Sequence, residues 1–272
     1  MKTLASIVLN LHREETLALR AVQSLRDLIA ATRAAGLSVE VTAVLDAAGP
    51  ITRRVIKDHR TLFDDVIEVQ VRDLGLARNA GIKASSGEYI ALLDGDDLWG
   101  SDWIVRGLEC ARERGDAAIW HPQYVYFFDQ EDHRFHVPSS SPSRSTASFF
   151  MEQISSDDPD FDPRALFINN VWTSNCIAHR NIFLERPFRS VDREQGLGFE
   201  DWTWNIETLV AGIAHRIVPN VIHMVRMKRQ GSLGGDSLQG ALLPRLPSEA
   251  RSLWLEPSKG PVDRDDERLL PS

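Results

Sequence analysis

Long apolar runs are the first thing that this sequence of 272 residues lacks. No stretch approaches the ~18 consecutive apolar residues that a helix needs to cross a bilayer. Residues 1–11 also have neither a long apolar segment nor a small-residue cleavage site, so they do not resemble a secretory signal. We therefore expect a cytoplasmic protein, with peripheral association at the inner face of the membrane left open.

Cysteine and positive charge are scarce as well. The two cysteines, Cys110 and Cys176, lie far apart in different predicted elements, so a disulfide framework or a zinc cluster is not expected. Lys and Arg number 31 against 39 Asp and Glu, a net charge of −8, which argues against a nucleic-acid partner. An acidic chain that binds a nucleotide must supply cations locally, through a metal and a few placed basic residues.

The composition that is present, 43% hydrophobic and 26% charged, is that of an ordinary globular protein. Hydrophobic periodicity predicts strands at 3–11, 39–45, 66–71 and 89–93, which alternate with helices at 14–35, 51–63, 76–85 and 102–114. Such alternation predicts an α/β fold with a mostly parallel sheet flanked by helices.

The pattern becomes less regular after residue 116. It predicts strands at 118–128 and 171–179, a Ser- and Pro-rich loop at 139–148, a helix at 200–211 and a strand pair at 215–227 broken at Pro219. We expect one domain over residues 1–232, with a small mixed region in its second half. Residues 233–272 are expected to be a tail that wraps the domain or stays mobile.

Three carboxylates crowd the end of the strand at 89–93. Asp94 and Asp96 can point to the same side of an extended chain, while Gly95 lets the backbone turn and a ligand approach. Asp97 follows directly. Hard oxygen ligands so close together favour Mg²⁺ or Mn²⁺, and a solvated acidic turn is the alternative.

Other polar residues are expected at the same edge of the predicted sheet. In open parallel sheets ligands bind beyond the carboxyl ends of the strands. His12 and Arg13 follow the first predicted strand and Asp46 follows the second. Gly75 opens a helix whose N-terminal amides, with Arg78, could receive a phosphate. A turn cap and a surface charge are the plainer explanations for Asp46 and Arg13.

Three ordered motifs resemble the family 2 glycosyltransferases with the GT-A fold, over about residues 5–232. They are residues 76–81 (LARNAG), 87–97 (GEYIALLDGDD) and 199–202 (FEDW). The resemblance implies transfer of a sugar from a nucleoside-diphosphate donor with inversion at the anomeric carbon. It also implies a donor half, 1–116, and an acceptor half, 117–232.

The resemblance further implies roles for donor-side residues. Asp46 would contact the nucleobase, with His12 beside it, and Asp94 would hold the ribose. Asp96 would bind the Mn²⁺ or Mg²⁺ that bridges the diphosphate, with Asp94 and Asp97 as neighbouring contacts.

On the acceptor side, inversion needs a carboxylate beside the attacking hydroxyl. Asp201 is the expected base, with Glu200 as its partner, and helix capping is the alternative for this pair. Trp202 is expected near the acceptor and Trp204 in the core. The irregular section at 117–164 is expected to hold further acceptor determinants.

Residues 221–232 resemble the family segment in which basic residues approach the diphosphate. Arg226 and Arg229 are therefore expected anion contacts, and His223 is a candidate metal ligand. A structural histidine and a solvated basic run are the alternatives.

The sequence departs from the family at two places. Asn10, His12 and Arg13 stand where a proline, an aromatic residue and an asparagine are usual, and Ala47 and Ala48 stand where an acidic residue is common. Both changes fall where the base and ribose should bind, so the identity of the nucleotide stays open.

Two other functions compete. A sugar nucleotidyltransferase would need a glycine-rich basic loop after the first strand, and residues 10–15 contain no glycine. A catalytically silent GT-A domain that binds a nucleotide sugar or a partner is the alternative from another class.

Overall fold

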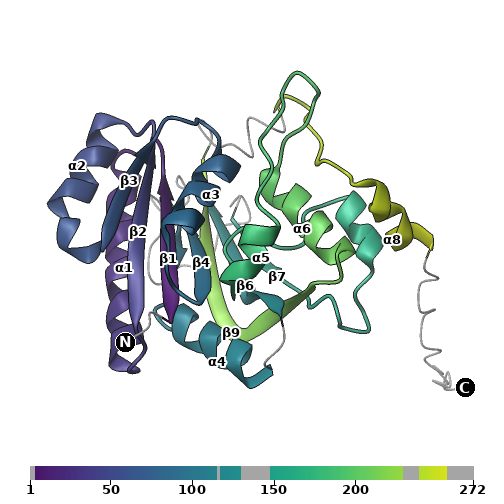
Figure 1. Ribbon diagram of the computed structural model, residues 1–272, viewed down its shortest axis with the longest axis horizontal. Coiled ribbons are helices and arrows are strands. Elements are labelled where there is room, and N and C mark those ends of the chain that lie inside the picture. Colours follow the sequence, from purple (N-terminus) through teal and green to yellow (C-terminus); the bar gives the residue numbers. More distant parts are fainter. Residues whose placement is uncertain (1–3, 115–116, 130–147, 229–238, 256–272) are drawn as a thin grey trace, which may run out of the picture.

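The computed structural model describes residues 4–114, 117–129, 148–228 and 239–255 of the chain. Within these residues nine strands form one sheet that is flanked by helices (Figure 1). The hydrogen-bonded order is β3 (Asp65–Val69), β2 (Val39–Asp46), β1 (Ala5–Leu11), β4 (Tyr89–Asp94), β8 (Ile177–His179), β6 (Ala118–Asp129), β9 (Ala214–Met227) and β5 (Leu98–Trp99), with β7 (Phe149–Glu152) paired to β6.

Helices alternate with the first strands as the periodicity predicts. The α-helices are α1 (Leu17–Ala34), α2 (Pro50–Asp58), α3 (Leu74–Ala84), α4 (Trp103–Arg114), α5 (Arg180–Glu185), α6 (Glu200–Val210) and α8 (Ser252–Leu255). Short 3-10 turns are η1 (Arg60–Leu62), η3 (Pro163–Phe167) and η4 (Ser248–Arg251). The first three strands and β4 pair in parallel, which confirms the predicted α/β fold.

The strand β1 is buried on both faces. Its side chains alternate between two hydrophobic clusters: Ile7 and Leu9 pack with residues of α1 and α4, whereas Val8 packs with residues of α3, α5 and α6. A strand covered on both faces needs apolar residues at every position, which explains the continuous apolar runs in this part of the sequence.

The carboxyl ends of the central strands are level with one another. Asn10 of β1 lies opposite Val44 of β2 on one side and Asp94 of β4 on the other. Asp46 ends β2, two positions beyond Val44. This register brings the polar residues that follow the strands to one edge of the sheet.

The prediction of a strand pair broken at Pro219 is wrong. β9 is one strand that runs parallel to β6, and Pro219 lies where the register shifts: Val218 pairs with Pro122 but Ile222 pairs with Tyr124. Asn220 adopts a positive φ there and its N–H donates to the Gln123 side chain. A bulge therefore absorbs the proline without ending the strand.

The predicted strand at 171–179 is too long, because only β8 at its end joins the sheet. The Trp172 ring packs with Leu166 and Ile206, and its indole N–H donates to the Ile154 carbonyl. The backbone that carries Trp172, which precedes β8, therefore lies outside the sheet. The loop predicted at 139–148 lies outside the described residues except for Ser148.

The described part of the C-terminal region packs on the second half of the chain. Leu243 forms a bridge with Leu197, and Ala250 lies in a cluster with Trp172 and Ile206. The rest of the predicted tail, residues 233–238 and 256–272, lies outside the described residues. Among the helices described, none has the length and apolar character needed to cross a membrane.

We expect Gly81→Ala to destabilise the fold, because a Cβ at this position of α3 would lie 2.4 Å from a Val8 methyl and 2.8 Å from a Val44 methyl. Both valines belong to central strands and cannot yield easily. The loss should be about 1–3 kcal/mol despite the better helix propensity of alanine, measured by urea unfolding. Lys83→Ala, on the exposed side of the same helix, should stay within about 0.5 kcal/mol; equal effects of the two changes would contradict this packing.

Candidate active site

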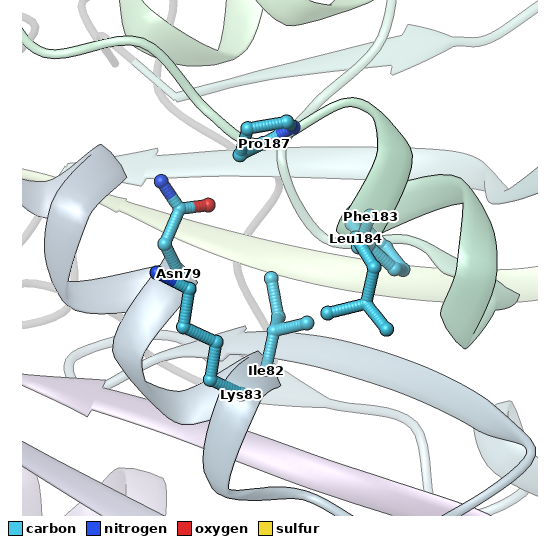
Figure 2. A pocket seen from close by; sticks show the side chains of 6 residues that line it. All are labelled: Asn79, Ile82, Lys83, Phe183, Leu184 and Pro187. Carbon is cyan, nitrogen blue, oxygen red and sulfur yellow. The ribbon is translucent and has the colours of Figure 1, made fainter.

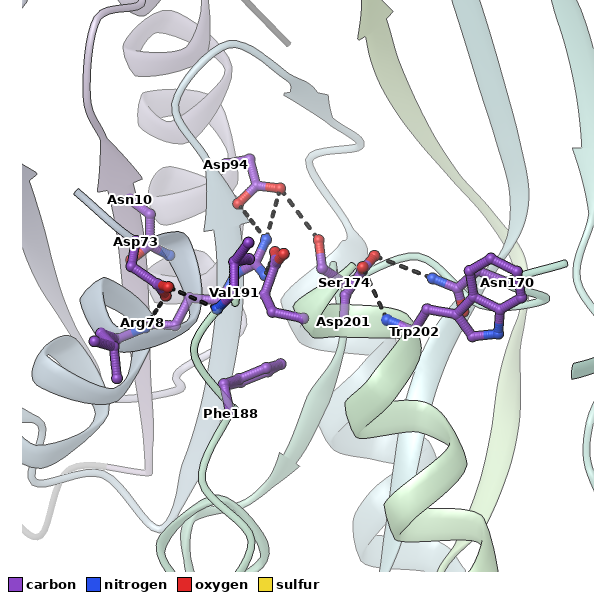
Figure 3. A network of polar contacts seen from close by, with 12 residues as sticks. Asn10, Asp73, Arg78, Asp94, Asn170, Ser174, Phe188, Val191, Asp201 and Trp202 are labelled. Carbon is purple, nitrogen blue, oxygen red and sulfur yellow. Dashed lines mark hydrogen bonds and ion pairs between the residues drawn. The ribbon is translucent and has the colours of Figure 1, made fainter. Parts of the chain in front are cut away.

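Arg78 is the centre of a polar network at the carboxyl edge of the sheet (Figure 3). Its side chain is 1% exposed, and Nη2 donates to both carboxylate oxygens of Asp94 at 3.0 and 3.1 Å. Nη1 donates to Glu200 Oε1 at 2.7 Å. Burial alone would lower the pKa of this guanidinium, but Asp94, Glu200 and Asp201 raise it above its usual value. Arg78 is therefore a fixed positive charge between β4 and α6.

The start of α3 holds this arginine in place. Asp73 caps the helix by accepting the Leu76 N–H through Oδ1, and its Oδ2 accepts the Val191 N–H. Asn79 exchanges two hydrogen bonds with the backbone of Phe188. The Phe188 ring centroid lies 5.4 Å from the guanidinium carbon. The helix and the segment around residue 188 thus form one support for the charge.

Glu200 and Asp201 have different partners although they are adjacent. Glu200 is buried against Arg78, and burial together with Asp201 raises its pKa to about 7. The two oxygens of Asp201 accept the Trp202 N–H at 2.8 Å and the Asn170 Nδ2 at 3.1 Å. Burial also raises the pKa of Asp201. Of the two, only Asp201 lacks a direct ion pair with the arginine among the described residues.

Asp94 has a second neighbour besides the arginine. The Ser174 hydroxyl donates to Asp94 Oδ2 at 3.1 Å (Figure 3). Asp94 therefore receives three hydrogen bonds from described side chains. A carboxylate held this way keeps lone-pair capacity for one further contact, and the ribose and metal roles suggested for Asp94 stay predictions.

Asp97 and His223 form a buried link between the acidic turn and β9. The His223 ring is 2% exposed, and its Nε2 lies 3.1 Å from Asp97 Oδ2 and 2.8 Å from Asn175 Nδ2. The other Asp97 oxygen accepts the Arg226 N–H. The metal role suggested for His223 stays a prediction; in this structure its Nε2 is engaged with Asp97 and Asn175.

Asp96 is paired with an internal cation. Lys228 Nζ lies 2.5 Å from Asp96 Oδ2, and Arg226 Nε donates to the Asp96 carbonyl. Burial and Asp97 raise the pKa of Asp96 to about 6, whereas Lys228 lowers it. Glu14 is close enough that burial and Asp96 raise its pKa to about 7.

A divalent cation fits this site only in part. The part of the chain that the structure describes has no group of three or more His, Cys, Asp and Glu that could enclose a metal. Asp96 itself fits, because a carboxylate surrounded by other acids is stabilised by a cation. The remaining ligands would have to come from water or from phosphates of a bound nucleotide, as is usual for Mg²⁺.

Asp46 and His12 meet at the ends of β2 and β1, as predicted. The Asp46 carboxylate accepts the Arg72 N–H at 2.9 Å and the Asp73 N–H at 3.1 Å, and the side chain is buried. The His12 ring bonds to the Asp46 carbonyl. Asp46 therefore fixes the loop that precedes α3, and a nucleobase would meet this loop as well as the carboxylate.

The two tryptophans of α6 differ in burial. Trp204 is buried and stacks on Phe183 and Phe188, which confirms that it is a core residue. Trp202 is half-buried, and its indole N–H donates to the Leu166 carbonyl. Its ring is fixed one position after Asp201, and the acceptor role suggested for it stays a prediction.

The basic segment at the end of β9 is only partly described. Arg226 is half-buried, with its guanidinium carbon 4.6 Å from the Phe128 ring centroid, and burial lowers its pKa. Arg229 lies outside the described residues. Lys228 rather than Arg226 makes the ion pair with Asp96.

Sequence reasoning did not assign Glu14, Asn170, Ser174 or Lys228. Lys228 belongs to the basic run at the end of β9, so charge alone could have drawn attention to it. Asn170 and Ser174 lie in irregular backbone between η3 and β8, and the strand predicted at 171–179 gave no indication of a site there. Only the folded chain brings them to Asp201 and Asp94.

A cavity elsewhere on the molecule does not coincide with this network. Figure 2 shows it between α3 and α5, with a volume of about 220 Å³. It is lined by Asn79, Ile82, Lys83, Phe183, Leu184 and Pro187. None of the acidic residues of the network lines it.

A family comparison now adds to this geometry. Residues 6–183 match the family described as Glycosyl transferase family 2. The chain belongs to this family. The match covers the parallel strands, α3 and the acidic turn, and it confirms the resemblance drawn from the motifs.

Similar proteins agree with the family 2 assignment. The succinoglycan biosynthesis protein ExoM of Rhizobium meliloti (strain 1021) is 29% identical over 108 residues, which are 39% of this chain and 35% of ExoM. The chain thus spans about a third of the length of this curated relative.

Two solved structures share the fold of this family 2 chain. A fragment of S. aureus TarS in complex with UDP-GlcNAc has a TM-score of 0.57 at 13% identity, with 85% of this chain and 61% of that chain covered. A mannosyltransferase, PcManGT of Pyrobaculum calidifontis, in complex with GDP-Man and Mn²⁺ has a TM-score of 0.55 at 13% identity, with 93% and 68% covered.

We expect Arg78→Met to lower the free energy of unfolding by about 3–5 kcal/mol, because it leaves the buried Glu200 and the half-buried Asp94 without their counter-ion. Adding Glu200→Gln should restore part of the loss, since a neutral amide needs no cation. Urea unfolding measures both. Arg54→Met is the control: that side chain is 81% exposed and lies 3.7 Å from Asp58, so its loss should stay below about 1 kcal/mol. Equal losses for the two single variants would contradict a structural charge at Arg78.

Proposed function

We propose that this chain transfers a sugar from a nucleoside-diphosphate sugar to a hydroxyl of a glycan or lipid-linked acceptor, with inversion at the anomeric carbon. The observation that carries the proposal is the chain of contacts Asp94–Arg78–Glu200, which joins the donor edge of the sheet to the start of α6. It leaves Asp201 beside the donor edge without an ion pair of its own to the guanidinium.

The complexes of similar proteins support the donor class. TarS is solved with UDP-GlcNAc and PcManGT with GDP-Man and Mn²⁺, and ExoM is named for succinoglycan biosynthesis. A polysaccharide or its lipid-linked precursor is therefore a reasonable acceptor class here. The base of the nucleotide stays open, because Asn10, His12 and Arg13 depart from the usual family pattern.

On the donor side, Asp94 accepts from the ribose, and the loop fixed by Asp46 borders the nucleobase. Asp96 holds a divalent cation, Mn²⁺ or Mg²⁺, and Arg226 lies next to the diphosphate. The chemical contribution of the cation is to neutralise the charge that develops on the leaving diphosphate. The divalent cation that accompanies the donor thus supplies positive charge beside the diphosphate in an otherwise acidic protein.

On the acceptor side, Asp201 accepts the proton of the attacking hydroxyl. Inversion by a single displacement needs one carboxylate, on the face opposite the leaving group. Burial raises the pKa of Asp201 and so strengthens it as a base, whereas hydrogen bonds from Trp202 and Asn170 keep it oriented. The ion pair of Glu200 with Arg78 anchors the first turn of α6, which carries Asp201, and Trp202 borders the acceptor.

The proposal is tested by measuring thermal unfolding with nucleoside diphosphates and their sugars, with Mn²⁺ or with EDTA. A donor present at about 100 times its dissociation constant should add about 2.7 kcal/mol of stability. Asp96→Asn should lose the part of this gain that requires Mn²⁺. A protein that responds to no nucleotide would instead fit a silent domain that binds another partner.

We expect Asp201→Asn to bind the donor as the wild type does and to lose at least ~100-fold in turnover, because the amide cannot accept the proton. Donor affinity and the rate of sugar transfer are measured on the same sample. Asp58→Asn, on the exposed side of α2, is the matched control and should keep full turnover. Wild-type turnover in Asp201→Asn would remove this residue as the base.

A further inference from the structure

The ion pair between Asp96 and Lys228 joins the residue expected to bind a metal to a basic residue that the sequence analysis did not assign. Both side chains are largely buried, with 14% and 18% of their surface exposed, and their charged atoms are 2.5 Å apart. An exposed pair at this separation would carry little meaning. A buried pair at the residue expected to bind a metal needs an explanation.

The backbone places the lysine firmly. Two contacts of Arg226 tie the end of β9 to the acidic turn: its N–H donates to Asp97 Oδ1 at 2.9 Å and its Nε donates to the Asp96 carbonyl at 3.0 Å. Lys228 follows two positions later, directly after the last residue of β9. The ammonium is therefore directed to Asp96 by the β9–turn junction.

The surroundings show why a cation is needed there. Glu14, Asp94 and Asp97 all lie near Asp96 or Lys228 and influence their ionisation. The Arg226 guanidinium is turned to the Asp96 carbonyl and the Phe128 ring, and not to a carboxylate oxygen of the turn. Lys228 is the described side chain that neutralises Asp96 directly.

A divalent cation and an ammonium cannot both occupy this position. Like charges within ~4 Å repel strongly in a partly buried site, and the metal would bind the same carboxylate that now receives the lysine. The lysine side chain is long and flexible, with three donors on a point charge, so it can move by rotation about its own bonds. An incoming diphosphate would offer it a new anionic partner.

We propose that Lys228 is the resident counter-ion of Asp96, which a divalent cation displaces, and that the released ammonium then binds the diphosphate of the donor. Lys228 is in this sense first a partner of the acidic turn and then a direct contact of the donor. It keeps the acidic turn compact before the donor arrives and moves to the donor afterwards. The second half of the inference rests on the proposed function, whereas the first half concerns the metal alone.

The first half is tested without any nucleotide. Mn²⁺ affinity is measured from the electron paramagnetic resonance signal of the free ion, for the wild type and for Lys228→Met. Removing the competing charge should tighten Mn²⁺ binding about tenfold. Adding Asp96→Asn to Lys228→Met should abolish that gain. Unchanged or weaker Mn²⁺ binding in Lys228→Met would overturn the proposal.

Two further variants guard this result. Lys228→Arg keeps the positive charge and should show no gain in Mn²⁺ affinity. A gain in Lys228→Arg would contradict competition by charge, so this variant still tests the proposal if Lys228→Met is poorly folded. Lys57→Met removes an exposed lysine of α2 and should leave Mn²⁺ affinity unchanged. A gain in Lys57→Met as large as in Lys228→Met would mean that only the overall charge matters, and would overturn the proposal.

The second half is tested with UDP and GDP at saturating Mn²⁺, by calorimetry. Lys228→Met should bind whichever diphosphate the wild type binds about tenfold more weakly, because one charged contact is lost. Opposite changes in the affinities for Mn²⁺ and for the diphosphate support the displacement, and unchanged diphosphate affinity overturns this half. If the Mn²⁺ effect appears but no variant binds a nucleotide, the counter-ion role stands and the proposed function fails.

Discussion

The charge of Arg78 is the constraint on which the rest of the site depends. A guanidinium that is 1% exposed is tolerable only between carboxylates, and the chain supplies them from β4 and from α6, elements more than 100 residues apart. Asp94 and Glu200 are consequently fixed relative to each other. The N-terminal cap of α3 and the two hydrogen bonds between the Asn79 side chain and the Phe188 backbone hold the helix that carries this charge. The carboxyl end of β4 and the start of α6 are thus joined by one ion network.

The parallel half of the fold could be predicted because its signals are local. Strands such as 89–93 are covered on both faces and are apolar throughout, and Asp94 follows one of them directly. The shape of β9 could not be predicted, because the bulge that accommodates Pro219 is set by pairing with β6, and Asn220 gains its hydrogen bond from Gln123. The same applies to the contact between Asn170 and Asp201, which depends on irregular backbone.

Site residues were easier to locate than to assign. Ligands in open sheets bind beyond the carboxyl ends of the strands, and this rule predicts that His12, Asp46 and Asp94 lie at one edge. The structure confirms that they lie there. The rule does not predict which of their polar atoms already form hydrogen bonds within the protein. Asp46 is occupied by two backbone N–H groups and His223 by Asp97, and both facts follow from tertiary contacts. Electrostatic pairing, which position along the chain does not predict, determines which of these polar groups are already engaged in the structure.

The bulge in β9 has a consequence for how the charged end of this strand is placed. Between the pairs Val218–Pro122 and Ile222–Tyr124, β6 advances by two residues and β9 by four. Strict alternation is suspended inside the bulge, because Val218 and Val221 belong to the same hydrophobic cluster although three positions separate them. Regular pairing resumes at Ile222 and sets His223 opposite Val125, within reach of Asp97. The charged end of β9 therefore takes its position from β6 and not from the part of β9 that precedes the bulge.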